Sequence, residues 1–119
     1  MRPINPLGVL AFATALAMPV LGRANTTAQP PIVKIAVHRF QFSPNQIILK
    51  KGETVRLELT STDTVHGFFA RPLKIDTDIR PERPTMVTVT PTTTGTFKVI
   101  CDHYCGIGHT FMKMTIVVE

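Results

Sequence analysis

The sequence predicts an all-β domain, a Greek-key sandwich built from two packed antiparallel sheets. Over most of residues 32–119, apolar residues alternate with polar ones at every second position, and no helical period runs longer than a turn or two. Turn-forming residues separate the alternating stretches at a spacing of about ten residues. Strands that each carry one apolar face are buried most simply when two sheets pack face to face.

Four stretches show the alternation most clearly. Their apolar faces, in chain order, are Val33, Ile35 and Val37, then Val55, Leu57 and Leu59, then Phe97, Val99 and Cys101, and finally Met114, Ile116 and Val118. Turn chemistry interrupts the chain at residues 43–45, 51–53, 80–84 and 91–95, because each of these segments contains proline or glycine. The alternation and the turns together predict one domain over residues 32–119.

Residues 1–24 have the features of a secretory signal peptide. They contain Arg2, a short apolar run and small residues at the expected cleavage point. A membrane-spanning helix needs about 20 apolar residues, and Pro19 interrupts this shorter run, which favours a signal peptide over an anchor. Residues 25–31 are interpreted as a flexible leader. We therefore expect the protein to be periplasmic or otherwise exported, whereas an uncleaved segment would tether it to the membrane.

The charge of the chain argues against nucleic acid as a partner. The 119 residues carry 13 Lys and Arg and 8 Asp and Glu, a net charge of +5. Removal of residues 1–24 leaves 11 basic and 8 acidic residues, a charge of +3, and the basic residues form no dense run. The sequence also shows no Ser-His-Asp set, no paired carboxylates and no phosphate-binding glycine loop, so catalysis by this chain alone is not expected.

Residues 101–112 concentrate the side chains that bind soft metals. This segment, CDHYCGIGHTFM, holds both cysteines of the chain, two of its four histidines and a methionine. Thiolate and thioether sulfur suit copper in its lower oxidation state, whereas structural zinc sites rarely use Met, and calcium and magnesium prefer oxygen. Glycines at 106 and 108 predict a tight loop that brings Cys105, His109 and Met112 together. The segment therefore predicts a copper site.

A second segment supplies another imidazole. His66 stands at the start of a predicted strand, within the sequence Asp63-Thr-Val-His-Gly-Phe68. His38 shares the polar face of its strand with Lys34, and we expect it to be exposed and without a function. His103 lies inside the loop, and its role is left open between a backbone carbonyl ligand, an imidazole ligand and an exposed side chain.

These motifs resemble a known metal centre. The pattern Cys101-x-His103-x-Cys105-Gly-x-Gly-His109-x-x-Met112, preceded by Val65-His66-Gly67-Phe68, is similar to the binuclear copper (CuA) site in the cupredoxin domain of cytochrome c oxidase subunit II. Nitrous oxide reductase carries a similar domain. The likeness extends from about Ile32 to Glu119, and it implies the cupredoxin-like form of the Greek-key sandwich.

The resemblance also implies a set of ligands. Both thiolates, Cys101 and Cys105, would bridge two copper ions. His66 and His109 would each bind one of the ions. Met112 would be a weak ligand to one copper, and the backbone carbonyl of His103 would be a weak ligand to the other. The family usually has Glu at this last position, but a residue that contributes only its backbone oxygen can be replaced without loss of the ligand.

The chain departs from subunit II in three respects. Subunit II normally has one or two N-terminal transmembrane helices, where this sequence offers only the signal-like segment. The chain has no Trp, whereas the family uses a tryptophan-containing patch to receive electrons from cytochrome c. A mildly basic surface would repel a basic cytochrome c at low salt. The resemblance is therefore stronger for the metal site than for the partner.

One-electron transfer between a donor and an acceptor protein, such as cytochrome c or a terminal oxidase, is the first functional hypothesis. Side chains near the site either exclude water or anchor the core and the loop, and they are Phe68, Phe69, Ile107 and Phe111. The first alternative is a periplasmic copper carrier that serves oxidase maturation. Another is a mononuclear blue-copper site in which Cys101 takes no part, and a last alternative is a Cys101–Cys105 disulfide without metal.

Overall fold

The computed structural model describes residues 13–17 and 29–119 of the chain. Of the predicted signal peptide only residues 13–17 belong to this part, and of the leader only residues 29–31. The rest of both segments lies outside the described residues. Within the described residues, no helix has the length and apolar character needed to cross a bilayer.

Strands account for most of the ordered elements in the described residues, as the alternation predicts. They are β1 (Ile32–His38), β2 (Gln41–Ser43), β3 (Gln46–Leu49), β4 (Val55–Ser61), β5 (His66–Ala70), β6 (Ile75–Ile79), β7 (Thr85–Val89), β8 (Gly95–Ile100) and β9 (Lys113–Val118). Two short 3-10 helices complete the set, η1 (Arg71–Leu73) and η2 (His109–Phe111). The predicted turns at 51–53 and 80–84 fall between strands, and those at 43–45 and 91–95 do so except for Ser43, the last residue of β2, and Gly95, the first residue of β8.

The strands form two sheets that pack into a sandwich. The first sheet has the order β2-β1-β4-β7, and the second has the order β3-β9-β8-β5-β6. The prediction that both sheets are antiparallel is wrong in two places, because β1 pairs with β4 and β3 pairs with β9 in parallel. Alternation of apolar residues marks which face of a strand is buried and carries no information about the direction of its neighbour.

The apolar faces predicted from the sequence form the core. In β4 the residues Val55, Leu57 and Leu59 are buried, and in β9 the buried residues are Met114, Ile116 and Val118. Phe42 and Phe68, from opposite sheets, meet edge to face with ring centroids 5.8 Å apart. The alternating burial along β1, β4 and β9 therefore confirms the two-residue period in these strands, whereas β5 is buried on both faces.

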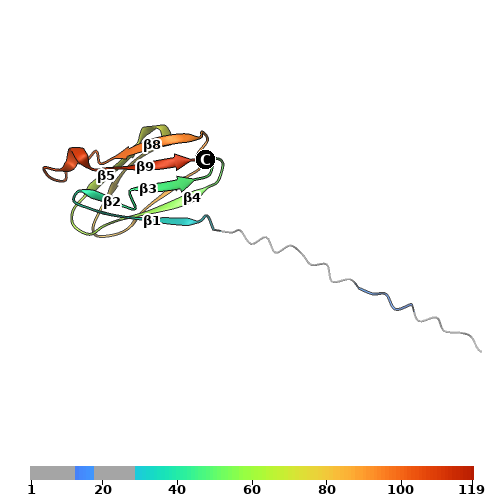
Figure 1. Ribbon diagram of the computed structural model, residues 1–119. Coiled ribbons are helices and arrows are strands. Elements are labelled where there is room, and N and C mark those ends of the chain that lie inside the picture. The colour runs from blue at the N-terminus through green and yellow to red at the C-terminus, as the bar shows by residue number, and fades with distance from the viewer. Residues whose placement is uncertain (1–12, 18–28) are drawn as a thin grey trace, which may run out of the picture.

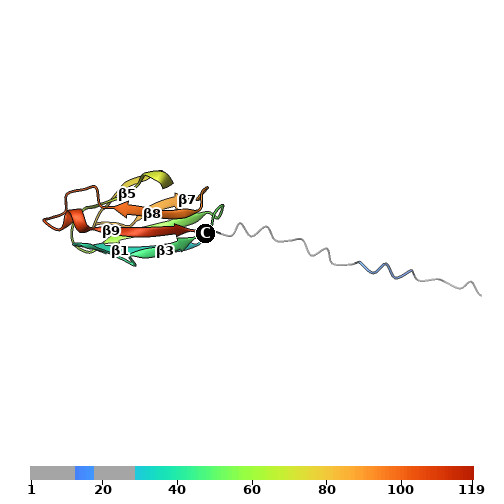
Figure 2. The ribbon, with the colours of Figure 1, turned by 45° about the horizontal axis from the view of Figure 1, so that its top comes forward.

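Three connections meet at one end of the sandwich. The turn between β1 and β2 (residues 39–40), the β4–β5 loop (residues 62–65) and the β8–β9 loop (residues 101–112) lie together, since Arg39 contacts both Asp63 and Cys105. Figure 1 and Figure 2 show the β8–β9 loop, coloured orange to red, at the end opposite the C-terminus. All six residues proposed as metal ligands belong to this end or to the first residue of β5.

Candidate metal centre

His66 is held in the interior by a carboxylate. Its side chain is fully buried at the first position of β5, and its Nε2 atom lies 2.7 Å from Oδ1 of Asp63. The backbone N–H groups of Arg39 and Thr64 also donate to this carboxylate, both at 2.7 Å. Partial burial would raise the pKa of Asp63, but these donors together hold it well below its ordinary value.

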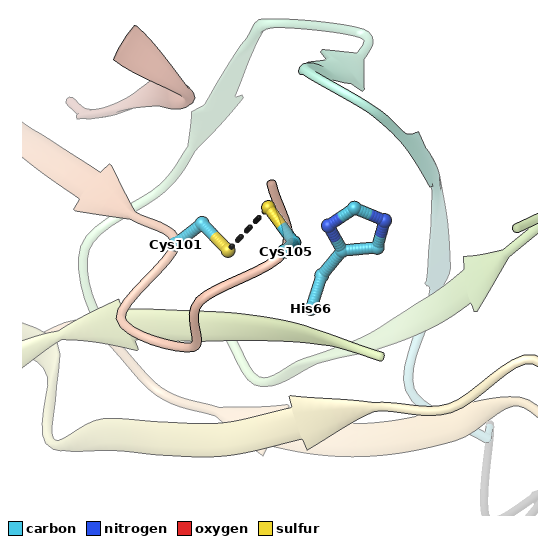
Figure 3. Close-up of side chains that lie close together, drawn as sticks. All are labelled: His66, Cys101 and Cys105. Carbon is cyan, nitrogen blue, oxygen red and sulfur yellow. Dashed lines mark hydrogen bonds between the residues drawn. The ribbon is translucent and has the colours of Figure 1, made fainter. Parts of the chain in front are cut away.

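The other imidazole nitrogen of His66 remains free. Nδ1 is buried, and it has no hydrogen-bond partner among the residues that the structure describes. A buried polar atom without a partner is costly and uncommon in native proteins. Figure 3 shows the ring of His66 with one nitrogen turned toward the sulfurs of Cys101 and Cys105. The lone pair of Nδ1 is thus available to a metal ion.

The two cysteines present a pair of free sulfurs. Both side chains are buried, and their Sγ atoms lie 3.7 Å apart, well beyond the length of about 2.05 Å of a disulfide bond. The structure therefore holds two thiols, and the disulfide alternative does not describe it. Burial, with Cys101 close by, raises the pKa of the Cys105 thiol well above its usual value. Binding of a metal cation would replace these protons.

Gly67 permits the β8–β9 loop to approach β5. Its backbone N–H donates to Sγ of Cys101 at 3.3 Å. A Cβ atom at this position would lie 2.8 Å from the backbone nitrogen atoms of both Asp102 and His103. Only glycine fits this approach, because real Cβ contacts are almost never shorter than 3.0 Å.

His109 and Met112 complete the group. Nδ1 of His109 and Sδ of Met112 each lie 3.9 Å from Sγ of Cys105. Met112 is buried, whereas His109, at the start of η2, is half-buried. The fold therefore brings the imidazole and the thioether that the loop sequence indicated to the same sulfur.

His103 places its backbone carbonyl beside the cysteine pair. Its carbonyl oxygen lies 3.2 Å from Sγ of Cys101, while the residue itself is exposed. Of the three roles left open for this residue, the carbonyl ligand is the one taken up below as a proposal. His38 is exposed, as expected, and its Nδ1 atom lies 2.9 Å from the carbonyl oxygen of Arg39.

The donor set fits copper. The ligand atoms of His66, Cys101 and Cys105 all lie within 4.8 Å of one another. Two thiols, two imidazoles, a thioether and a carbonyl make a sulfur- and nitrogen-rich site, which suits copper and excludes calcium and magnesium. The six residues that the sequence singled out thus converge, and their role as ligands is taken up below as a proposal.

Some of the residues around the site differ from the expectations. Phe68 is buried in the core, but Ile107 and Phe111 are 94% and 79% exposed, so neither can exclude water from the metal site. Sequence reasoning did not assign a role to Asp63 or to Arg39. Asp63 could have been found from its spacing three residues before His66. Arg39 could not have been found, since only the fold brings its turn to the loop.

Comparison with known proteins agrees with this geometry. Residues 8–118 match the family of cupredoxin-like domains. Cytochrome c oxidase subunit 2 of Thermus thermophilus is 33% identical over 87 residues, which are 73% of this chain and 64% of that protein. The nitrous-oxide reductase of Cupriavidus necator is 28% identical over 122 residues, 99% of this chain and 19% of that protein. The chain thus spans less than two thirds of the length of these relatives.

A solved structure shows the same fold. The periplasmic domain of subunit II of cytochrome oxidase from Bradyrhizobium japonicum superposes with a TM-score of 0.69, at 19% identity, over 75% of this chain and 83% of that chain. At this identity the structural likeness establishes the architecture alone. The family match covers most of the chain, and the sequence relatives point in the same direction. The chain belongs to the family of cupredoxin-like domains and is homologous to subunit 2 of cytochrome c oxidase.

Proposed function

We propose that this protein binds two copper ions in a CuA-type centre and transfers single electrons between protein partners. One observation carries the proposal. Two free sulfurs lie 3.7 Å apart in the interior, beside a buried imidazole nitrogen that has no other partner in the described part of the chain. A pair of thiolates at this spacing can bridge two soft cations, and homology to oxidase subunit 2 supports the same chemistry.

Each residue has a defined part in the proposed centre. Cys101 and Cys105 provide the bridging sulfurs. His66, through Nδ1, and His109 provide one imidazole to each ion. The thioether of Met112 and the backbone carbonyl of His103 are weak ligands, as the resemblance to the CuA site implies. Copper held by these residues would supply a centre that can change its oxidation state by one electron.

The protein would keep its ligands in place during electron transfer. His66 is fixed by Asp63, and the backbone N–H of Gly67 donates to the sulfur of Cys101. Buried partners of this kind restrict movement of the ligands, because each side chain has its orientation set by a hydrogen bond. Ligands that hardly move between oxidation states lower the reorganisation that accompanies electron transfer.

The partners would meet the protein at the exposed part of the β8–β9 loop. Three large side chains of this loop are exposed, by 72% for Tyr104, 94% for Ile107 and 79% for Phe111. The ring of Tyr104 lies 6.0 Å from that of His109, between ring centroids. An apolar surface next to a metal ligand suits a brief contact with a redox protein. We propose a cytochrome c or a terminal oxidase as donor or acceptor, in the periplasm or another exported compartment.

Copper reconstitution tests the function directly. We expect two copper ions per chain, counted by atomic spectroscopy, and an electron paramagnetic resonance signal in which one unpaired electron couples equally to two copper nuclei. Cys101→Ser should abolish this signal, because it removes one of the two bridging sulfurs. Coupling to a single nucleus in the unchanged protein, with a Cys101→Ser variant that retains an intense blue-copper spectrum, would contradict the binuclear centre. Rapid loss of copper to a chelator would favour copper delivery over electron transfer.

A further inference from the structure

Arg39 connects the two segments that carry the proposed ligands. Its backbone N–H donates to Oδ2 of Asp63 at 2.7 Å, and Oδ1 of the same carboxylate lies 2.7 Å from Nε2 of His66. Its side-chain Nε donates to the backbone carbonyl of Cys105, also at 2.7 Å. One residue of the β1–β2 turn is therefore bonded to the support of His66 and to the backbone of Cys105.

The neighbouring residue packs on the same loop. A Cβ atom at Gly106 would lie 2.9 Å from the ring of Phe40, and a Cβ atom at Gly108 would lie 2.5 Å from it. Gly108 has φ near −83°, which any residue adopts. At Gly108 the Phe40 ring occupies the space that a Cβ atom would take, so an added side chain would have to displace this ring. The β1–β2 turn thus closes over the β8–β9 loop at two points.

The bond from Arg39 to Cys105 is of the strong kind. The donor is a guanidinium, which remains charged at any physiological pH, and the contact is partly buried. By contrast, three of the loop's own backbone bonds are short-range, with His109, Phe111 and Met112 each donating to a carbonyl three residues earlier. Bonds within a loop fix its internal shape, while a bond from a distant segment such as the β1–β2 turn fixes its place in the protein.

We propose that Arg39 is the positioning residue of the metal centre, which fixes Cys105 relative to His66 and places a permanent positive charge beside the sulfur ligands. The effect of Arg39 on the redox potential depends on the proposed copper-binding function, whereas its effect on the position of the loop does not. A fixed positive charge favours the state of the centre that carries one more electron. Arg39 would therefore slow the loss of copper and raise the midpoint potential, without touching the metal.

Two variants separate position from charge. Arg39→Met keeps an unbranched apolar side chain that reaches about as far as Nε, but it removes both the donor and the charge. Arg39→Lys keeps the charge but places a methylene where Nε donates, so that it does not reproduce the bond. Arg71→Met is the matched control, since Arg71 is exposed in η1, which follows the end of β5 remote from His66. All variants are made in the full chain.

The first measurement needs no copper. Amide hydrogen exchange of the copper-free, reduced protein is followed by NMR at His109, Phe111 and Met112, whose N–H groups are bonded within the loop. We expect exchange about fivefold faster in Arg39→Met and in Arg39→Lys than in Arg71→Met. Equal exchange in all three variants would overturn the positioning role, whatever the metal content of the protein.

The second measurement uses the copper-loaded protein. Transfer of copper to a chelator should be faster in both Arg39 variants than in the Arg71→Met control. The midpoint potential should fall only in Arg39→Met, by about 30 mV, which corresponds to an about threefold change in the ratio of reduced to oxidised protein. A potential that is the same in Arg39→Met and the control would overturn the electrostatic part. Absence of a two-copper signal in the unchanged protein would refute the proposed function, and the exchange measurement would still decide the role of Arg39.

Discussion

The two segments that carry the proposed ligands are held by different means. His66 is the first residue of β5, and its strand continues into the core through Phe68, which is fully buried against Phe42. The β8–β9 loop instead buries only three residues, the proposed ligands Cys101, Cys105 and Met112, and its other side chains lie partly or fully in solvent. The position of His66 is therefore determined by the packing of the sandwich core.

The position of the β8–β9 loop depends on a small number of contacts. Gly67 and Arg39 hold the loop through the sulfur of Cys101 and the carbonyl of Cys105. The exposed remainder of the loop is the part that a partner protein can reach. The difference teaches that β5 can fix the geometry of the proposed ligands, while the exposed β8–β9 loop gives a partner protein access to them. The same kind of substitution should therefore change protein stability by different amounts in β5 and in the loop.

Replacement of one phenylalanine in each segment tests this difference most strongly. We expect Phe68→Ala to lower the free energy of unfolding by about 3–5 kcal/mol, because it removes a buried ring and leaves a cavity in the core. Phe111→Ala, which makes the same chemical change at a residue that is 79% exposed, should change it by less than about 0.5 kcal/mol. Urea unfolding of the copper-free protein provides both values. Equal losses would show that the loop is part of the core.

The contact between the two segments gives the next largest effect. Gly67→Ala should cost about 1–3 kcal/mol, since its Cβ meets backbone atoms of Asp102 and His103 that cannot move without shifting the loop. Gly108→Ala is the comparison, because its Cβ meets the ring of Phe40, a side chain that is 40% exposed and can turn away. We expect the smaller loss for Gly108→Ala in thermal unfolding. A larger loss there would mean that the Phe40 contact, and not β5, determines the position of the loop.

Much of this arrangement could be predicted from the sequence. The alternation in residues 55–59 and 114–118 identified strands whose apolar faces are buried in the structure. The spacing of Cys101, Cys105, His109 and Met112 identified a loop whose sulfur and nitrogen atoms do converge. Both signals are local, because a strand face and a short loop are encoded by residues close together in the chain.

Contacts between distant segments could not be predicted in this way. The parallel pairing of β1 with β4 leaves no trace in the alternation, and it is this pairing that brings the end of β1 beside the β4–β5 loop. Arg39 and Asp63 are 24 residues apart, and Arg39 and Cys105 are 66 residues apart. A polar residue at a turn is ordinarily interpreted as solvated, so nothing in the local sequence separated Arg39 from the other arginines.

The smallest expected effects come from two carboxylates, one in the β4–β5 loop and one in the β8–β9 loop, whose pKa values shift in opposite directions. Asp63, in the β4–β5 loop, has a lowered pKa, because its hydrogen-bond donors outweigh the effect of partial burial. Asp102, in the β8–β9 loop, has a raised pKa, first because of partial burial and then because of the nearby carboxylate of Asp76. The ionised form of Asp63 therefore stabilises the folded protein, whereas the ionised form of Asp102 destabilises it.

The signs of the two pH effects follow from these shifts. The stabilising contribution of the Asp63 carboxylate is complete above the ordinary carboxyl pKa, near 4, and is lost as the pH falls below that value. Asp63→Asn should therefore lower the free energy of unfolding at pH 7 by about 1 kcal/mol. The difference between this variant and the unchanged protein should shrink toward pH 2. The penalty from Asp102 is absent when the carboxyl is protonated in both states and grows as the pH rises. Asp102→Asn should therefore raise stability at pH 7 by a smaller amount, and this difference should also vanish in acid. Urea unfolding of the copper-free protein between pH 2 and 7 measures both. Effects of the same sign would contradict the opposite directions of the two pKa shifts, and with them the different local partners of the two carboxylates.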